Sequence, residues 1–251
     1  MRKVSDPDEL GELFGADRET HLYGLADLEE PYWSASVWFR DGSAAVGLVS
    51  VGDDWVTGYA MSRVAPEATV ALLAEVQARL PGGSWVTGPV GMYESISQVR
   101  STRAIGPHWR MILEELNEQA DGPDAVTLGA NELDALNDLH RSDEGGAFFL
   151  PTMMKRNPFV GIWEDGRLVA SAGTHVVSKR HGVAAIGAVI TRPSHRGRGL
   201  GRLVMSALCR HLMEHYETIG LNVETANQSA LHLYERLGFR AVFQYEEIEL
   251  I

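Results

Sequence analysis

The stretch Ile190-Thr191-Arg192-Pro193-Ser194-His195-Arg196-Gly197-Arg198-Gly199-Leu200-Gly201-Arg202 decides the fold of this chain. An apolar run over residues 183–191 leads into it, and an amphipathic run over residues 199–216 leads out. The spacing predicts a strand, a glycine-rich turn and a long helix. Glycines allow a ligand to approach the backbone closely, and a helix start presents unpaired amides and a positive dipole end. The stretch therefore predicts an anion site, suited to phosphate.

Three arginines in this stretch support that prediction. Arg196, Arg198 and Arg202 add positive charge to a chain in which 22 Lys and Arg oppose 34 Asp and Glu. A dinucleotide fingerprint starting at Gly197 requires glycine where Arg202 stands, and the Gly-Lys-Ser/Thr ending of a P-loop is missing. Both common nucleotide motifs are thereby excluded. The plain alternative is a tight turn with a solvated basic rim.

Charge and cysteine content limit the function classes. The net charge of −12 repels phosphate backbones and anionic lipids, so we expect no nucleic acid and no membrane as partner. Cys209 is the only cysteine, which excludes an intrachain disulfide and a cysteine-based zinc site. We find neither a secretory signal nor a run of about 18 apolar residues, so the expected location is cytoplasmic.

Strand-like and helix-like runs alternate along the whole chain. The polar, acidic stretch 113–124 ends in Gly-Pro, which is typical of an interdomain connection, so we predict domains at 1–118 and 125–251. In the first domain we expect helices at 6–27 and 65–80 and strands at 33–39, 44–51, 55–59 and 84–87. In the second we expect helices at 131–140, 199–216 and 227–237, and strands at 125–128, 159–163, 167–177, 183–191, 221–223 and 241–250.

Two local details accompany these ranges. Asn131 is a plausible N-cap for the helix at 131–140. Glu164-Asp165-Gly166 supplies the turn chemistry of a hairpin between the strands at 159–163 and 167–177.

The glycine-arginine stretch resembles the signature of the GNAT superfamily of N-acetyltransferases, which is Arg or Gln, two residues, Gly, one residue, then Gly or Ala. Residues Arg196 to Gly201 fit it in full. Residues Asn227 to Phe239 resemble the second hallmark of the family. The likeness covers 125–251, and the first half resembles, more weakly, the degenerate amino-terminal lobe of two-lobed members. It implies an α/β fold with mixed, mostly antiparallel sheets in two tandem acyl-CoA N-acyltransferase-like lobes.

The resemblance also implies the roles of individual residues, with acetyl-CoA as co-substrate. The strand before the loop would lend backbone groups to the pantetheine arm, the loop amides would hold the pyrophosphate, and Asn227 would bond the pantetheine. Tyr234 matches the general acid, and a phenol of pKa near ~10 can protonate a thiolate leaving group of pKa near ~8.5. The cofactor-binding residues so implied are Val189, Ile190, Thr191, Arg196, Gly197, Arg198, Gly199, Leu200, Gly201, Arg202 and Asn227.

The function that this resemblance implies is transfer of an acetyl group from acetyl-CoA to a primary amine of a small molecule by direct attack. Cys209 lies within the predicted long helix, away from any evident base, which argues against a covalent intermediate. Two alternatives stay open: a CoA-binding sensor or partner module without turnover, and a transferase that acts on a protein amino terminus or uses a longer acyl donor. The oligomeric state is not encoded in any motif.

Other residues keep both a functional and an ordinary interpretation. Candidate bases by rough location are Asp143, Glu144, His175 and Glu224, each with an ordinary alternative as surface charge or hydrogen-bonded histidine. His175 lies in a predicted strand, where a structural histidine is the favoured interpretation, so it is not counted in the predicted site. Tyr234 could simply pack against the closing strand, and Asn227 could be an N-cap. The segment 145–151 is the expected acceptor contact. His211 and His215 stand four apart without an evident third ligand, so no metal is predicted.

Overall fold

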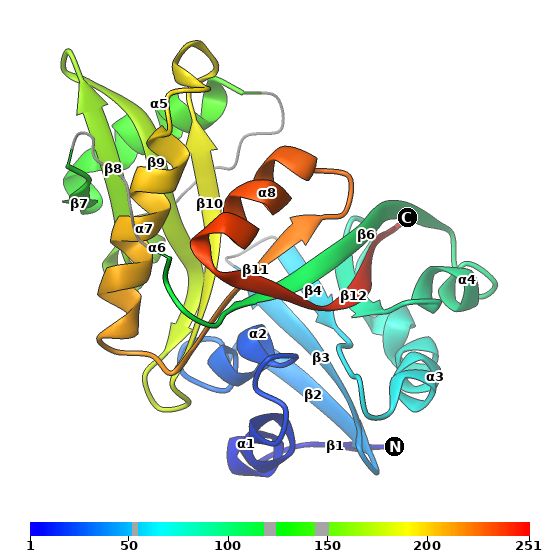
Figure 1. The fold of residues 1–251 in the computed structure, drawn as a ribbon. Helices are drawn as coiled ribbons and strands as arrows, with labels where there is room; N and C mark the ends of the chain where they lie inside the picture. Colours follow the sequence, from blue (N-terminus) through cyan, green and yellow to red (C-terminus); the bar gives the residue numbers. More distant parts are fainter. Residues whose placement is uncertain (52–54, 118–123, 144–150) are drawn as a thin grey trace. The chain divides into compact units, whose positions relative to one another are not determined.

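The computed structural model describes residues 1–51, 55–117, 124–143 and 151–251 (Figure 1). The chain divides into two compact units. The first comprises Met1–Met111, Val223–Gln228 and Ala241–Ile251, and the second comprises Ile112–Asn222 and Ser229–Arg240. The closing strand thus belongs largely to the unit formed by the first half of the chain.

The first unit is a sheet with helices packed on it. Its strands follow the order β1-β2-β3-β4-β5-β12-β6, in which β4 and β5 are parallel. The strands are β1 (Arg2–Lys3), β2 (Ser36–Asp41), β3 (Ala44–Val51), β4 (Trp55–Tyr59), β5 (Trp85–Pro89), β6 (Thr102–Leu113) and β12 (Phe239–Leu250). The helices are α1 (Pro7–Gly15), α2 (Leu22–Ala26), α3 (Pro66–Val76) and α4 (Met92–Ile96).

The closing strand β12 is held in this unit by pairing, packing and capping. It pairs antiparallel with β5 from Tyr245↔Pro89 to Glu249↔Trp85. Ile248 and Leu250 are fully buried in one apolar cluster with side chains of α3 and β5. Glu246 accepts hydrogen bonds from the amides of Gly91 and Tyr93, at 3.0 and 2.9 Å, and so satisfies the amino-terminal amides of α4.

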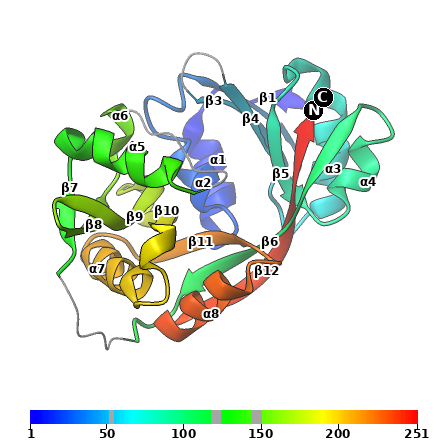
Figure 2. The ribbon, with the colours of Figure 1, turned by 90° about the horizontal axis from the view of Figure 1, so that it is seen from above.

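The second unit has the strand order β11-β10-β9-β8-β7, with helices on both faces (Figure 2). Its strands are β7 (Val126–Leu128), β8 (Phe159–Glu164), β9 (Arg167–Ser178), β10 (Val183–Thr191) and β11 (Thr218–Glu224). Its helices are α5 (Leu133–Arg141), α6 (Pro151–Arg156), α7 (Leu200–Met213) and α8 (Gln228–Leu237). Helices α5 and α6 cover one face of β8 to β10 and α7 covers the other. An apolar cluster between α5 and the strands includes Leu136, Leu139, Phe159, Leu168 and Ile190.

Several predictions from local pattern are confirmed. The strands at 44–51, 55–59 and 183–191 have the predicted bounds. The hairpin between β8 and β9 turns at Asp165 and Gly166, which both have positive φ values of 48° and 75°. A type I′ turn requires positive φ at both central positions, and Asp-Gly tolerates it well.

Other local predictions are wrong. The predicted helix 6–27 is two helices, because Asp17 accepts hydrogen bonds from the amide and the hydroxyl of Thr20 and stabilises a turn between them. Asn131 is not the N-cap, since α5 begins at Leu133 after a short 3₁₀ turn in which Glu132 accepts from the Gly129 amide at 2.7 Å. The long strand β6 went unpredicted because it contains Gly106-Pro107, a pair that usually breaks strands.

The first unit contains a buried carboxyl group that gives its stability a pH dependence. Asp27, at the end of α2, is 8% exposed, and burial raises its pKa to about 8. Between pH values of roughly 4 and 8 the folded state therefore holds a proton that the unfolded state has lost, so stability falls as pH rises. Burial lowers the pKa of His21 to about 4, which has the opposite effect, but only below the ordinary value of 6.5.

We therefore expect the free energy of unfolding of the wild type to fall between pH 6.5 and 8, by at most about 1.4 kcal/mol per pH unit. Asp27→Asn keeps the shape of the neutral acid but has no group that titrates. In this variant the free energy of unfolding should therefore stay constant between pH 6.5 and 8. Urea denaturation at a series of pH values measures both slopes. An unchanged slope in Asp27→Asn would contradict the assignment.

Candidate functional site

Strand β10 changes its pairing near its carboxyl end. Its parallel pairing with β11 runs from Val183↔Thr218 to Ile186↔Leu221. Its pairing with β9 continues to Thr191, with a register shift between Gly187 and Ile190 where Ala188 has a φ of 52°. This β-bulge turns the strand, and over 187–191 the edge toward β11 has no ladder partner among the described strands. The Arg192 amide donates to the Val169 carbonyl on β9, so Ile190, two residues earlier, also directs its backbone groups to β9. The backbone groups of Val189 face the other edge and are open to a ligand.

The loop after β10 brings a helix start to the end of the strand. A 3₁₀ turn at Pro193–His195 precedes Gly197 and Gly199, whose φ values of 76° and 79° lie in the left-handed region. Gly199 is the N-cap of α7 and has no side chain to cap it. The amides of Leu200 and Gly201 make no hydrogen bond to any residue that the structure describes. These two belong to the loop amides, from Gly197 to Arg202, that were predicted to hold the pyrophosphate, whereas the Arg202 amide donates to the Gly199 carbonyl oxygen at 3.0 Å.

The three glycines of the loop have different reasons to be glycine. Gly197 and Gly199 have open space where a Cβ would be, so their backbone conformation, and not crowding, excludes other residues. A Cβ on Gly201 would lie 3.5 Å from Thr191 Oγ1 and 3.6 Å from Leu233 Cδ2, which is ordinary contact. The fold therefore does not require glycine at 201. A ligand bound close to the amide of residue 201 would require it.

Two of the predicted arginines are neutralised by carboxylates. Arg196 pairs with Asp143 and also donates to the Thr191 carbonyl oxygen at 3.2 Å. Arg198 donates two hydrogen bonds to Glu164, at 2.7 and 2.8 Å, and these hold the pKa of Glu164 below its ordinary value. Arg202 is half-buried and forms no ion pair with any described residue. Of the three, Arg202 therefore keeps its charge available to an anion, while the other two fasten the loop.

Tyr234 lies on α8 and is 7% exposed. Its ring packs 6.0 Å from that of Phe239, the first residue of β12, so the packing role considered for it is present. Its hydroxyl makes no hydrogen bond to the part of the chain that the structure describes. Burial raises the pKa of Tyr234 to about 12 and that of Cys209 to about 12. Both groups stay protonated at neutral pH, which suits Tyr234 as a proton donor and disfavours Cys209 as a nucleophile.

The candidate bases differ in their surroundings. Asp143 is engaged with Arg196, and Glu224 is exposed in a segment of the first unit. His175 is accessible, and it is the extra residue of β9 at the register shift between Ala185 and Ile186. Its ring occupies the space beside Gly187, where an added Cβ would lie 2.2 Å from Nε2. Desolvation holds the pKa of His175 below its ordinary value, so the ring is neutral at pH 7 and able to accept a proton.

Two further expectations concern the edges of the site. Glu144 and residues 145–150 of the expected acceptor segment lie outside the described residues, and α6 begins at Pro151. Asn227 directly precedes α8, is exposed, and donates its amide to the Glu224 carbonyl at 3.0 Å. Its contact with pantetheine stays a prediction.

The sequence profile of the acetyltransferase (GNAT) family matches residues 114–239, just over half of the 251 residues. The chain belongs to this family. The matched region contains β10, the glycine-arginine loop and α8. The expected membership and α/β fold class are thereby confirmed.

Known proteins resemble the chain in part or in whole. A mycothiol acetyltransferase of Tsukamurella paurometabola is 40% identical over 76 residues, which are 30% of this chain and 26% of that protein. A Drosophila protein of known structure superposes with a TM-score of 0.75 at 17% identity, covering 100% of this chain and 98% of the other. A tandem GNAT protein from the clavulanic acid biosynthesis pathway covers 99% and 98%, with a TM-score of 0.55 at 14% identity.

These comparisons differ in how much of each chain they cover. The chain spans about a quarter of the length of the mycothiol acetyltransferase that it matches. The two structures cover the whole chain at low identity, and so support the tandem arrangement of the fold alone. Among the described helices, none is long and apolar enough to span a membrane.

The loop geometry predicts opposite effects of alanine at two glycines in the protein without ligand. Gly199→Ala should lower the free energy of unfolding by about 1–2 kcal/mol, because a Cβ opposes the left-handed conformation. Gly201→Ala should be neutral or slightly stabilising, since the residue is helical and uncrowded. Urea denaturation of both variants measures the difference. Equal losses in the two would contradict the roles assigned to these glycines.

Proposed function

We propose that this chain transfers an acetyl group from acetyl-CoA to a primary amine of a small molecule, in the cytoplasm. The observation that carries the proposal is the combination, within the second unit, of an unpaired strand edge on β10 and free amides at the start of α7. The first fits an extended amide-containing arm, and the second fits a pyrophosphate. Coenzyme A contains both groups in one molecule.

The pyrophosphate would be bound chiefly by backbone. The amides of Leu200 and Gly201 would donate to it, with the helix dipole and the Arg202 charge as further attraction. Arg196 and Arg198 would act indirectly, by fastening the loop to Asp143 and Glu164. We therefore propose a positioning role for these two arginines, beside the direct cofactor contact that the family resemblance implies.

The acyl group would lie where the bulge opens the edge of β10. A backbone amide of the 189–191 segment can donate to the thioester oxygen and stabilise the negative charge that develops on it during attack. The incoming amine must first lose a proton, and His175 is the accessible neutral base on the neighbouring strand. Tyr234 would then protonate the departing thiolate.

The net charge of the chain and the name of a related protein both bear on the class of acceptor. An acidic chain attracts cationic amines at long range. The relative from Tsukamurella is named for mycothiol and not for a protein acceptor. Both observations favour a small-molecule amine over a protein amino terminus.

Acetyl-CoA binding is the first test of the proposal. Acetyl-CoA should raise the thermal midpoint of the wild type, because a ligand at 100 times its Kd stabilises by about 2.7 kcal/mol. Gly201→Ala should have the same midpoint as the wild type without ligand, but acetyl-CoA should raise it much less. The reason is that the added methyl group fills only space that the ligand would use. Scanning fluorimetry with millimolar acetyl-CoA makes the comparison. No rise in a folded wild type would overturn the proposal.

Removing the Tyr234 hydroxyl tests the chemical step. Tyr234→Phe should lower kcat by about 10²–10⁴-fold while leaving acetyl-CoA affinity unchanged, because the hydroxyl would act only as the thiolate departs. Release of free CoA thiol in the presence of a panel of small primary amines measures turnover, and the thermal shift measures binding. Phe239→Leu is the matched control, since it alters the packing of the Tyr234 ring and leaves the hydroxyl in place. Equal turnover of wild type and Tyr234→Phe would remove Tyr234 from the mechanism.

A further inference from the structure

The last turn of α7 gathers three side chains that the acetyl transfer does not use. His211 lies in the helix, and Glu214 and His215 follow its last residue, Met213. The backbone stays coiled through them, because the amides of His215 and Tyr216 both donate to the Leu212 carbonyl, at 3.0 and 2.9 Å. Residues three and four apart lie on one face of a helix. His211, Glu214 and His215 therefore form a fixed cluster on the surface.

The ligand atoms of this cluster are close together and unoccupied by other residues. One nitrogen of each histidine and one carboxylate oxygen all lie within 4.8 Å of one another. The two imidazole rings are 5.5 Å apart and nearly perpendicular, at 84°. All three residues are exposed, and none of their side chains makes a hydrogen bond or an ion pair with any residue that the structure describes. Their lone pairs are thus directed to solvent.

The donor set matches a particular class of metal ion. Two imidazole nitrogens and one carboxylate oxygen suit Zn²⁺, with water in the fourth position. Tetrahedral coordination at 2.0–2.1 Å places donors about 3.3 Å apart, so only rotations of exposed side chains are needed to close the cluster on an ion. The carboxyl end of a helix also carries a partial negative charge, which favours a cation there.

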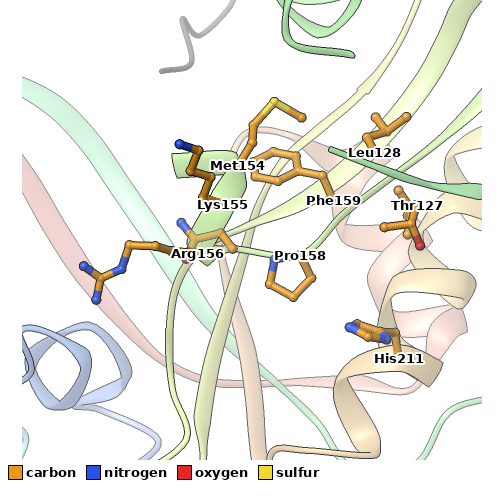
Figure 3. Close-up of a pocket in the computed structure, with 10 residues that line it drawn as sticks. Thr127, Leu128, Met154, Lys155, Arg156, Pro158, Phe159 and His211 are labelled. Atoms are coloured by element: carbon orange, nitrogen blue, oxygen red, sulfur yellow. The ribbon is translucent and has the colours of Figure 1, made fainter. Parts of the chain in front are cut away.

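The surroundings of His211 separate the cluster from the acetyl-CoA loop. His211 is the one residue of α7 that lines a pocket of about 230 Å³, whose other walls come from β7, α6 and β8 (Figure 3). Its neighbours Lys155 and Arg156 extend away from it in this view. The pocket adjoins Phe159 at the start of β8, whereas Glu164 at the other end of β8 holds Arg198 of the loop. The cluster and the loop are at opposite ends of α7, about 20 Å apart at 1.5 Å per residue.

We propose that His211, Glu214 and His215 form a surface site for a divalent transition metal ion, with Zn²⁺ as the ion that its donors favour. The sequence suggested no metal here because only the two histidines were evident as ligands. The structure supplies Glu214 as the third. Binding would join the final turn of α7 in a chelate ring without touching the residues assigned to acetyl transfer.

Isothermal titration of tag-free, chelator-treated protein with ZnCl₂ tests the site. We expect one equivalent to bind with a Kd on the order of micromolar. His211→Ala and His215→Ala should each weaken binding by about 10-fold or more, and Glu214→Gln by less. His232→Ala is the matched control, because His232 is an exposed helix residue with Glu235 three positions on but no second histidine. It should bind as the wild type does.

Co²⁺ provides an independent readout, since its visible absorption reports a tetrahedral protein site. The wild type and His232→Ala should show the band, and the double variant His211→Ala/His215→Ala should not. Zn²⁺ binding that survives in the double variant would overturn the proposal. So would the absence of saturable binding by the wild type when the metal is in 100-fold molar excess over the protein. Neither readout depends on acetyl transfer, and the altered residues are exposed, so the variants should fold.

Discussion

The connection from β10 to α7 is the constraint on which the site depends. A strand edge and a helix start can meet at one place only if the chain reverses within a few residues, and Gly197 and Gly199 permit this through positive φ values of 76° and 79°. The Arg196–Asp143 and Arg198–Glu164 pairs then fasten the loop to the rest of the second unit. The result is a set of donors that is already oriented before any ligand arrives, so little ordering entropy is lost on binding.

Under the proposed function, this arrangement also explains how an acidic protein binds an anion. Two of the three loop arginines have their charge compensated, so attraction would come from oriented amides, a helix dipole and Arg202. Such dipoles act at short range, whereas the net charge of −12 acts over longer distances. The proposed function thus combines long-range attraction of cationic acceptors with short-range binding of a polyanionic cofactor.

Local sequence was sufficient for the features that depend on a few neighbouring residues. The Asp165-Gly166 turn, the bounds of β10 and the glycine-rich helix start were all predictable, because each follows from the φ preferences or the periodicity of a short segment. Prediction failed where a distant partner overrides the local preference. Strand β6 runs through Gly106-Pro107 as a strand, and α4 is capped by Glu246, more than 150 positions away.

The sequence by itself determined the family and predicted the phosphate-type loop and Tyr234 as the general acid, since these depend on residue types at fixed spacing. Only the tertiary structure decided that the closing strand pairs with β5, that Arg196 and Arg198 are neutralised, and that His175 occupies the space beside Gly187. Ion pairs and strand pairing join residues far apart in the chain, and burial depends on everything packed around a group. No local pattern encodes these quantities, and they set which charges and which protons the site can use.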